Sequence, residues 1–561
     1  GEFTSPYYGE VWANELRMVG LEERGGVAGL ARLDADLADL GSVGIAGNYS
    51  SIGWGALDQK LDDRAKESVT QVDFSTNLQL GKFLGANSKV QIPFYYQYSE
   101  TVRKPQFDAL DLDLPLDEKL KSIADPVKRD SVREQSQDFS SLKQISITNM
   151  RVNGGGGGKP MPWDISNLAA SYAYSRTYAR NEVVEKDQLD QHRASLDYIY
   201  SISSKPLEPF KGLSKSNWLK WLTEINLNPI PSSFTFGTVM DRKFGERSYR
   251  FSDPIYKTWF DKRFTWVRTY SLRWDLTRSI KINFNAANAA VVDEPNEYID
   301  RPNGILIDPK DRKQAIWDNI LEGGRTKDYN HQFRATFAVP LKTIPLVDWI
   351  RMDLSYDATY SWKAASINTD SLGNVIQNGQ TNQISTEFDF VKLYNKSAFL
   401  NKINKTGSSS GANQGGRTPA RQGPTKPTVD PPKDDPNAKD NTKSDAKADD
   451  DKKKSKEISP PLKVALRMLM AIRKFRINYG ETNGTTIPGY TPASEILGSS
   501  QGLGAPGLSF ISGIQPKINR KAYADDGDYL AEARANGWIT TNAFQNAPVL
   551  QFKTKALDSR I

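Results

Sequence analysis

The stretch IRMDLSYDATYSW, residues 350–362, alternates between two kinds of side chain along its whole length. The apolar or aromatic members are Ile350, Met352, Leu354, Tyr356, Ala358, Tyr360 and Trp362, and the residues between them are polar or charged. Because successive side chains of a strand point to opposite faces, the stretch predicts one long strand with an apolar face and a hydrated face. The pattern leaves open whether the apolar face meets a protein core or a lipid bilayer.

The same alternation recurs along the chain, so the sequence predicts an all-β, antiparallel protein. The clearest runs cover residues 70–80, 90–98, 168–174, 194–202, 264–284, 331–339, 384–391 and 469–479, and the last residues, VLQFKTKALDSRI, resemble an interrupted strand. We count roughly a dozen such runs, and most approach the ~10 residues that a tilted strand needs to cross a bilayer. This favours a transmembrane β-barrel segment.

The composition agrees with such a segment. Hydrophobic residues are 38% and charged residues 25% of the 561, and no run of about 20 apolar residues predicts a membrane-spanning helix. A lipid-facing strand is apolar only at every second position, so a barrel reads as polar on average. Lys and Arg (74) nearly balance Asp and Glu (67), and no basic stripe with interleaved aromatics predicts a nucleic-acid partner.

Few segments predict helices. DPKDRKQAIWDNILEGG has Asp308 as N-cap and Gly323 as its end, residues 116–137 are charged and partly helical in pattern, and a helix from Pro460 is expected to run into a strand. We therefore divide the chain into barrel strands with long loops and short helical insertions (1–405), a disordered Lys/Asp-rich linker (406–457), and further barrel strands (458–561). The opening GEFTSPYYGEVW has no charged-then-apolar leader, and we expect the chain to be a piece of a longer precursor.

Nothing in the sequence predicts an enzyme, a cofactor or a metal site. There is no cysteine, and His192 and His331 have no ligand motif around them. The acidic stretch 108–117 lacks the turn glycine of a calcium loop and is expected to be a solvated, strand-like loop. GKP at 158–160 has Pro160 where a phosphate loop needs Ser or Thr.

Several blocks of sequence resemble the SprA/Sov family, in family order. They include GEVWANELRM, ARLDADLADLGSVGIAGNYSSIGWGALDQK, KPMPWDISNLAASYAYS, NLNPIPSSFTFGTVMDRKF, FTWVRTYSLRWDLTRSIKINFNAANAAVVDEP, VPLKTIPLVDWIRMDLSYDATYSW and IPGYTP followed by LG, APGLSF and NGWIT. The family is the outer-membrane translocon of the Bacteroidota type 9 secretion system, which also supports gliding motility. None of these blocks is a catalytic signature.

The resemblance implies one very large barrel in the outer membrane, of which this chain is a part. It implies a wide, water-filled lumen that exports folded cargo proteins, and a lateral opening closed by a PorV-like barrel or a periplasmic plug protein. Outer-membrane lipid, secreted cargo, the PorV-like barrel and the plug protein are therefore the expected partners.

With the resemblance, each face of the strand 350–362 receives an expected environment. We expect Arg351, Asp353 and Asp357 to face the lumen and Leu354 and Tyr356 to face lipid. Trp349, Tyr360 and Trp362 are expected to form an interface belt at headgroup level. Two other classes stay open: a soluble or surface-exposed β-rich adhesin or carbohydrate-binding module, with the same faces buried between sheets, and an outer-membrane uptake receptor.

The connections give an expected sidedness. The short connection PLKTIPLVDW between the strands ending at Val339 and starting at Ile350 is taken as periplasmic, because barrels have short periplasmic turns and long outer loops. The strand 350–362 then runs outward and the next returns. This parity predicts that the tract 406–457 lies in the periplasm.

Overall fold

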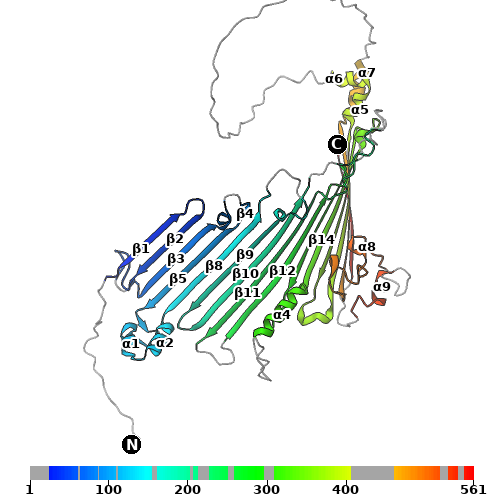
Figure 1. The fold of residues 1–561 in the computed structure, drawn as a ribbon. Coiled ribbons are helices and arrows are strands. Elements are labelled where there is room, and N and C mark those ends of the chain that lie inside the picture. The colour runs from blue at the N-terminus through cyan, green and yellow to red at the C-terminus, as the bar shows by residue number, and fades with distance from the viewer. Residues whose placement is uncertain are drawn as a thin grey trace, which may run out of the picture.

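The computed structural model describes residues 25–60, 63–85, 88–108, 111–154, 161–202, 206–212, 226–250, 258–295, 309–405, 460–518, 528–540 and 549–561. Its main feature is one antiparallel sheet of 16 strands, in which β1 and β18 are the two edges (Figure 1). Strands follow one another in chain order, except that the short β4 pairs with β8. The all-β, antiparallel prediction is confirmed, whereas closure into a barrel is not seen among the described residues.

The strands of the sheet are β1 Ala28–Asp36, β2 Gly41–Ser50, β3 Glu67–Gln79, β4 Val90–Gln91, β5 Pro93–Pro105, β8 Asp138–Val152, β9 Leu168–Arg180, β10 Val184–Ser201, β11 Ser233–Tyr249, β12 Thr258–Trp274, β13 Ile280–Val291, β14 Arg325–Val339, β15 Ile350–Lys363, β16 Asn374–Asp389, β17 Lys474–Tyr490 and β18 Leu550–Arg560. A separate small pair is β6 Phe107–Asp108 and β7 Asp111–Pro115. The α-helices are α1 Leu116–Ser122, α2 Pro126–Ser136, α4 Pro309–Leu321, α5 Phe390–Lys396, α6 Ala398–Lys405, α7 Pro460–Leu469, α8 Leu508–Ile511 and α9 Tyr529–Ala535.

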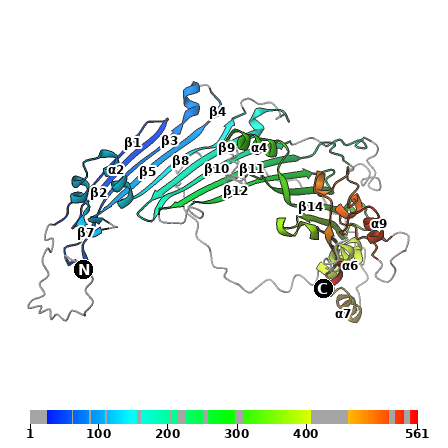
Figure 2. The ribbon, with the colours of Figure 1, turned by 90° about the horizontal axis from the view of Figure 1, so that it is seen from below.

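The sheet is strongly curved, with a convex and a concave face (Figures 1 and 2). The α4 helix and the α8–α9 region lie on the convex side, and α5, α6 and α7 extend beyond the upper end of the last strands. Among the described residues, no helix is long and apolar enough to cross a membrane.

The helices agree with the sequence predictions where the structure describes them. The charged segment 116–137 forms α1 and α2, and Asp125 caps α2 by accepting a hydrogen bond from the Val127 N–H at 3.0 Å. The α4 helix begins at Pro309 and ends before Gly323, which has φ +89°, a conformation that favours glycine. The α7 helix is followed by β17, as predicted. The expected cap Asp308 and the tract 406–457 lie outside the described residues.

Two expectations are wrong. The stretch 108–117 is not a solvated loop throughout, because the Asp108 carboxylate is buried, accepts a hydrogen bond from Ser136 Oγ at 2.8 Å and pairs with Lys119. The two rims of the sheet, which are the upper and lower strand ends in Figure 1, also do not separate into one with short and one with long connections. The upper rim holds the short turns after β1 and β12 and also the long connection from β8 to β9, and the lower rim holds a three-residue turn between β9 and β10.

Candidate functional site

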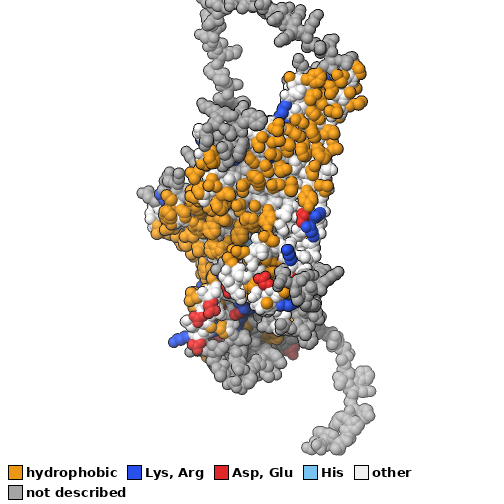
Figure 3. All heavy atoms as spheres, turned by 90° about the vertical axis from the view of Figure 1, so that its right-hand side faces the viewer, with side chains coloured by type: hydrophobic (Ala, Val, Ile, Leu, Met, Phe, Trp, Pro, Cys, Tyr) orange, Lys and Arg blue, Asp and Glu red, His pale blue; other side chains and the backbone are white. Residues whose placement is uncertain are grey.

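The convex face of the sheet carries a broad band of apolar side chains, visible as the orange surface in Figure 3. Register decides its membership: Leu354 pairs with Phe337 on one side and with Ile384 on the other, so paired side chains share a face. By the same register the band includes Ile45, Phe74, Tyr96, Ile145, Leu196, Phe236, Leu272, Phe284 and Phe333. The band thus crosses most of the strands from β2 to β15.

The lower boundary of the band is a row of tyrosine hydroxyls that contact charged groups. Tyr98 donates to Glu100, and Tyr174 donates to Asp190 at 2.9 Å, where Arg176 also binds at 2.6 Å. Below this row the convex face becomes charged. Amphipathic rings of this kind suit a membrane–water boundary, because one end is apolar and the other binds water or ions.

The upper boundary is a cluster of aromatic rings at the ends of β15, β16 and β17. The Trp349 ring lies 5.9 Å from Phe388 and 5.6 Å from Phe390, and Phe388 stacks on Phe475 at 6.0 Å. Phe390 stacks in turn on Tyr394 of α5. Of this group, the sequence predicts an interface position only for Trp349, because the other rings come from strand ends that meet only in the folded sheet.

The height of the band fits a bilayer. On β10 it runs from Asp190 to Tyr200, which at ~3.3 Å per residue is about 33 Å along the strand. A strand tilted by ~35–45°, as in outer-membrane barrels, would cover about 25 Å of membrane normal, the height of their apolar band.

The concave face is polar and carries paired charges of both signs. The pairs are Arg32–Asp34, Arg103–Glu67, Arg193–Asp241, Lys243–Asp261, Arg247–Asp187, Arg334–Asp357, Arg351–Asp353 and Arg476–Glu387. Arg351, Asp353 and Asp357, expected to face a lumen, all lie on this face, and the Arg351–Asp353 distance is 2.9 Å. The face is therefore a hydrated wall with little net charge, although its identity as a lumen stays a prediction.

Leu354 and Tyr356, expected to face lipid, lie on the convex face. Leu354 is partly exposed and does not belong to the buried cluster that the described residues form. Tyr356 stands at the edge of a region where the chain covers its own sheet, and its hydroxyl donates to the Ser512 carbonyl at 2.5 Å. The contact of these side chains with lipid stays a prediction.

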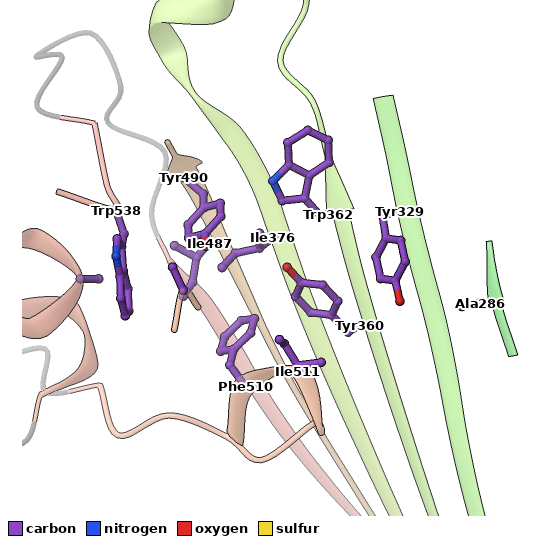
Figure 4. Close-up of a cluster of buried hydrophobic side chains, with 12 residues drawn as sticks. Ala286, Tyr329, Tyr360, Trp362, Ile376, Ile487, Tyr490, Phe510, Ile511 and Trp538 are labelled. Carbon is purple, nitrogen blue, oxygen red and sulfur yellow. The ribbon is translucent and has the colours of Figure 1, made fainter. Parts of the chain in front are cut away.

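The last part of the chain covers the lower convex face of β13 to β17. We name residues 491–518 and 528–540 the covering segment. Its Phe510, Ile511 and Trp538 form one buried cluster with strand side chains such as Tyr329, Tyr360 and Ile376 (Figure 4). Tyr529 of α9 stacks 5.6 Å from Phe510, and burial there raises the pKa of its hydroxyl.

Hydrogen bonds fix the covering segment to the sheet. Tyr360 donates to the Gly498 carbonyl at 2.8 Å, and Trp362 Nε1 donates to the Pro492 carbonyl at 3.1 Å. His331 Nε2 lies 3.0 Å from the Ile511 carbonyl. Tyr360 and Trp362 are only 1% and 3% exposed, so both expected belt residues contact their own chain and not an open surface. Trp349 is half-buried, so among the three expected belt residues it alone stays a candidate for a place at the membrane interface.

The lower part of the apolar band is interrupted at β16–β18. On this part of the convex face, Glu481 of β17 binds Lys553 of β18 at 2.6 Å, and Asn483 donates to the same carboxylate at 3.2 Å. Next to them, Asn378 of β16 is buried beneath α8. A charged cluster at this height would be costly against hydrocarbon, so this edge of the convex face differs in kind from the rest.

One family model matches the first part of the chain. Residues 2–120 match the SprA_N family model, described as motility related/secretion protein. The match supports membership of the SprA family. No curated protein matches the chain.

The matched residues include β1 to β5, one end of the two-faced sheet. The apolar band, the paired wall and the covering segment extend well beyond that match. Among the described residues, no three His, Asp or Glu side chains gather as metal ligands. The expectation of no cofactor and no enzymatic activity stays a prediction.

Proposed function

We propose that this sheet is an arc of an outer-membrane β-barrel, the protein-conducting translocon of the type 9 secretion system, which exports folded cargo and supports gliding motility. One observation carries the proposal: the sheet has a bilayer-high apolar band outside and a wall of paired charges inside. Membership of a motility- and secretion-related family supports it. The unpaired edges of β1 and β18 would then pair with further strands of the same barrel.

The soluble adhesin or carbohydrate-binding class fits less well. A soluble sandwich needs a second sheet over the apolar face, and the described residues provide only the covering segment, which reaches β13 to β17. In the part of the chain that the structure describes, no such cover lies over the upper convex surface, which includes Leu354. An isolated patch of that size on a soluble protein would favour aggregation, whereas in a bilayer it is the required outer surface.

The concave wall suits the passage of folded proteins. Side chains such as Arg334 and Asp357 neutralise each other in place, so the wall holds water without attracting one sign of charge. An apolar wall would bind exposed hydrophobic groups of the cargo, and a wall of one sign would retain cargo of the other. We propose a PorV-like barrel and a periplasmic plug protein as partners that close the pore, and no catalytic role for the chain.

The test compares the two faces of one strand. Leu354→Arg places a charge on the band about midway between Trp349 and the covered residue Tyr360, where lipid burial costs about 2–4 kcal/mol. Asp353→Asn changes the neighbouring residue on the wall and leaves the band intact. The amount of assembled protein in the outer-membrane fraction, and secretion of a reporter cargo, should fall sharply for Leu354→Arg and stay near normal for Asp353→Asn.

If both variants assemble and secrete equally well, the assignment of the faces is wrong. If Asp353→Asn alone fails, lipid and wall are exchanged. A protein that is soluble without detergent would instead support the adhesin class.

A further inference from the structure

The α6 and α7 helices form a small pair beyond the upper end of β16 and β17 (Figure 1). The two helices lie against each other, and Ile403 of α6 (1% exposed) and Met470, directly after α7 (7% exposed), are buried. The opposite side of α7 is apolar and uncovered: Val464 is 53%, Met468 75% and Leu469 72% exposed. At helical spacing these positions, with Leu462, form a stripe wider than 100° along the helix.

The charges around this stripe have one sign. Residues 460–474, PPLKVALRMLMAIRK, contain Lys463, Arg467, Arg473 and Lys474 and no acidic residue. An amphipathic helix with an apolar stripe and basic residues on its other side suits a phospholipid surface, where the stripe enters the headgroup boundary and the cations meet phosphates.

The stripe is continuous with the apolar band. Phe390 of α5 stacks on Phe388 at the top of the band, and Tyr394 of the same helix donates from its hydroxyl to the Ile472 carbonyl at 3.2 Å. Ile472 lies just after α7 and is 43% exposed. In Figure 3 the hydrophobic surface of the strands continues up to these helices. The stripe therefore begins where the proposed bilayer ends.

We propose that α7 lies in the headgroup region of the membrane that the sheet spans and anchors this rim to the lipid surface. The occupant of the stripe is phospholipid, and the inference rests on the proposed function. The described helices α6 and α7, which flank residues 406–459 in the chain, are then both held at the membrane.

Depth-dependent fluorescence quenching tests the proposal, because this chain contains no cysteine and one introduced thiol is unique within it. The intact protein, with any thiol outside this chain replaced, carries an environment-sensitive dye at Met468→Cys and is reconstituted into nanodiscs. Nitroxide-labelled lipids quench near the headgroup or deep in the acyl region. We expect roughly twofold loss of emission with the shallow label and less with the deep label, since such helices sit about 5–10 Å into the boundary.

Two further positions make each outcome informative. Leu354→Cys, on the apolar band, should be quenched by lipid, and Leu57→Cys, fully exposed on the lower rim, should not. Quenching at Leu354 without quenching at Met468 overturns the anchor alone; a blue-shifted but unquenched Met468 signal would mean that protein covers the stripe. Lack of quenching at Leu354 overturns the proposed function, and the anchor with it.

Discussion

A single glycine controls how closely the covering segment approaches the sheet. Gly498 has φ +78°, and its carbonyl accepts the Tyr360 hydroxyl bond. A Cβ built at Gly498 would overlap the rings of Tyr329 and Tyr360. Both rings belong to paired strands and are buried, so neither can move aside without disturbing the cluster.

We predict that Gly498→Ala releases the covering segment, because it combines left-handed strain of about 1–2 kcal/mol with overlap of two fixed rings. Limited proteolysis within residues 491–518 should become clearly faster. Gly502→Ala is the matched control: it has φ +64° and open space around its Cβ, so it carries the strain without the overlap. Equal proteolysis of the two variants would show that the contact with the tyrosines is unimportant.

At the scale of elements, the contact between β16 and α8 depends on a buried amide. Asn378 Nδ2 donates to the Phe510 and Ile514 carbonyls, each at 3.1 Å, and its side chain is 1% exposed. The Phe510 carbonyl also accepts the Gly513 N–H at 3.1 Å, and Ile514 follows α8 in the chain. The amide therefore adds two hydrogen bonds that an apolar residue could not make.

We predict that Asn378→Leu weakens the contact of the covering segment with the sheet by about 1–3 kcal/mol, the net contribution of two hydrogen bonds. Hydrogen–deuterium exchange of residues 508–515 should rise, while exchange in β15 stays slow. Gln377→Leu, a similar change on the exposed concave face of the same strand, should leave exchange unchanged. Protection that survives Asn378→Leu would contradict the role of the amide.

The elements also show what the sequence can and cannot reveal. Alternation identified β12 to β15, because one face of each carries a run of mostly apolar or aromatic residues at every second position. The alternation is lost in most of β16 and in the lower part of β17. There the polar residues Asn378 and Thr485 stand on the apolar face and contact the covering segment. For the same reason the sequence does not reveal that Tyr360 and Trp362 are covered: their partners, Gly498 and Pro492, are 138 and 130 residues away, and alternation carries no information on such contacts.

At the scale of the molecule, antiparallel parity fixes which segments share a rim. Because β15 and β16 are antiparallel neighbours, α5 to α7 return to the rim that holds residues 340–349. Direct contacts confirm this: Lys396 of α5 pairs with Asp348 and also donates to the Pro345 carbonyl. The predicted parity is confirmed, and the periplasmic identity of this rim stays a prediction.

We predict that trypsin added to intact cells spares the Lys-rich tract 406–457 and cuts it only after the outer membrane is permeabilised. The opposite rim supplies the control. Residues 51–60 belong to the connection from β2 to β3 there and include the fully exposed Leu57, so a broad-specificity protease should cut them in intact cells. Cleavage of the tract in intact cells with an unbreached membrane would reverse the topology.

The paired charges of the concave wall have a consequence for friction. In each of these pairs a carboxylate lies beside the guanidinium or ammonium group, as in Arg103–Glu67 and Lys243–Asp261. The surface therefore resembles a zwitterionic coating: strongly wetted, yet without a long-range field beyond about one Debye length. A folded protein sliding past such a surface displaces little tightly bound counter-ion and finds no adhesive spot of its own opposite charge. Acidic and basic cargoes would then experience a similar drag, and the wall itself would act as a lubricant and not as a selector.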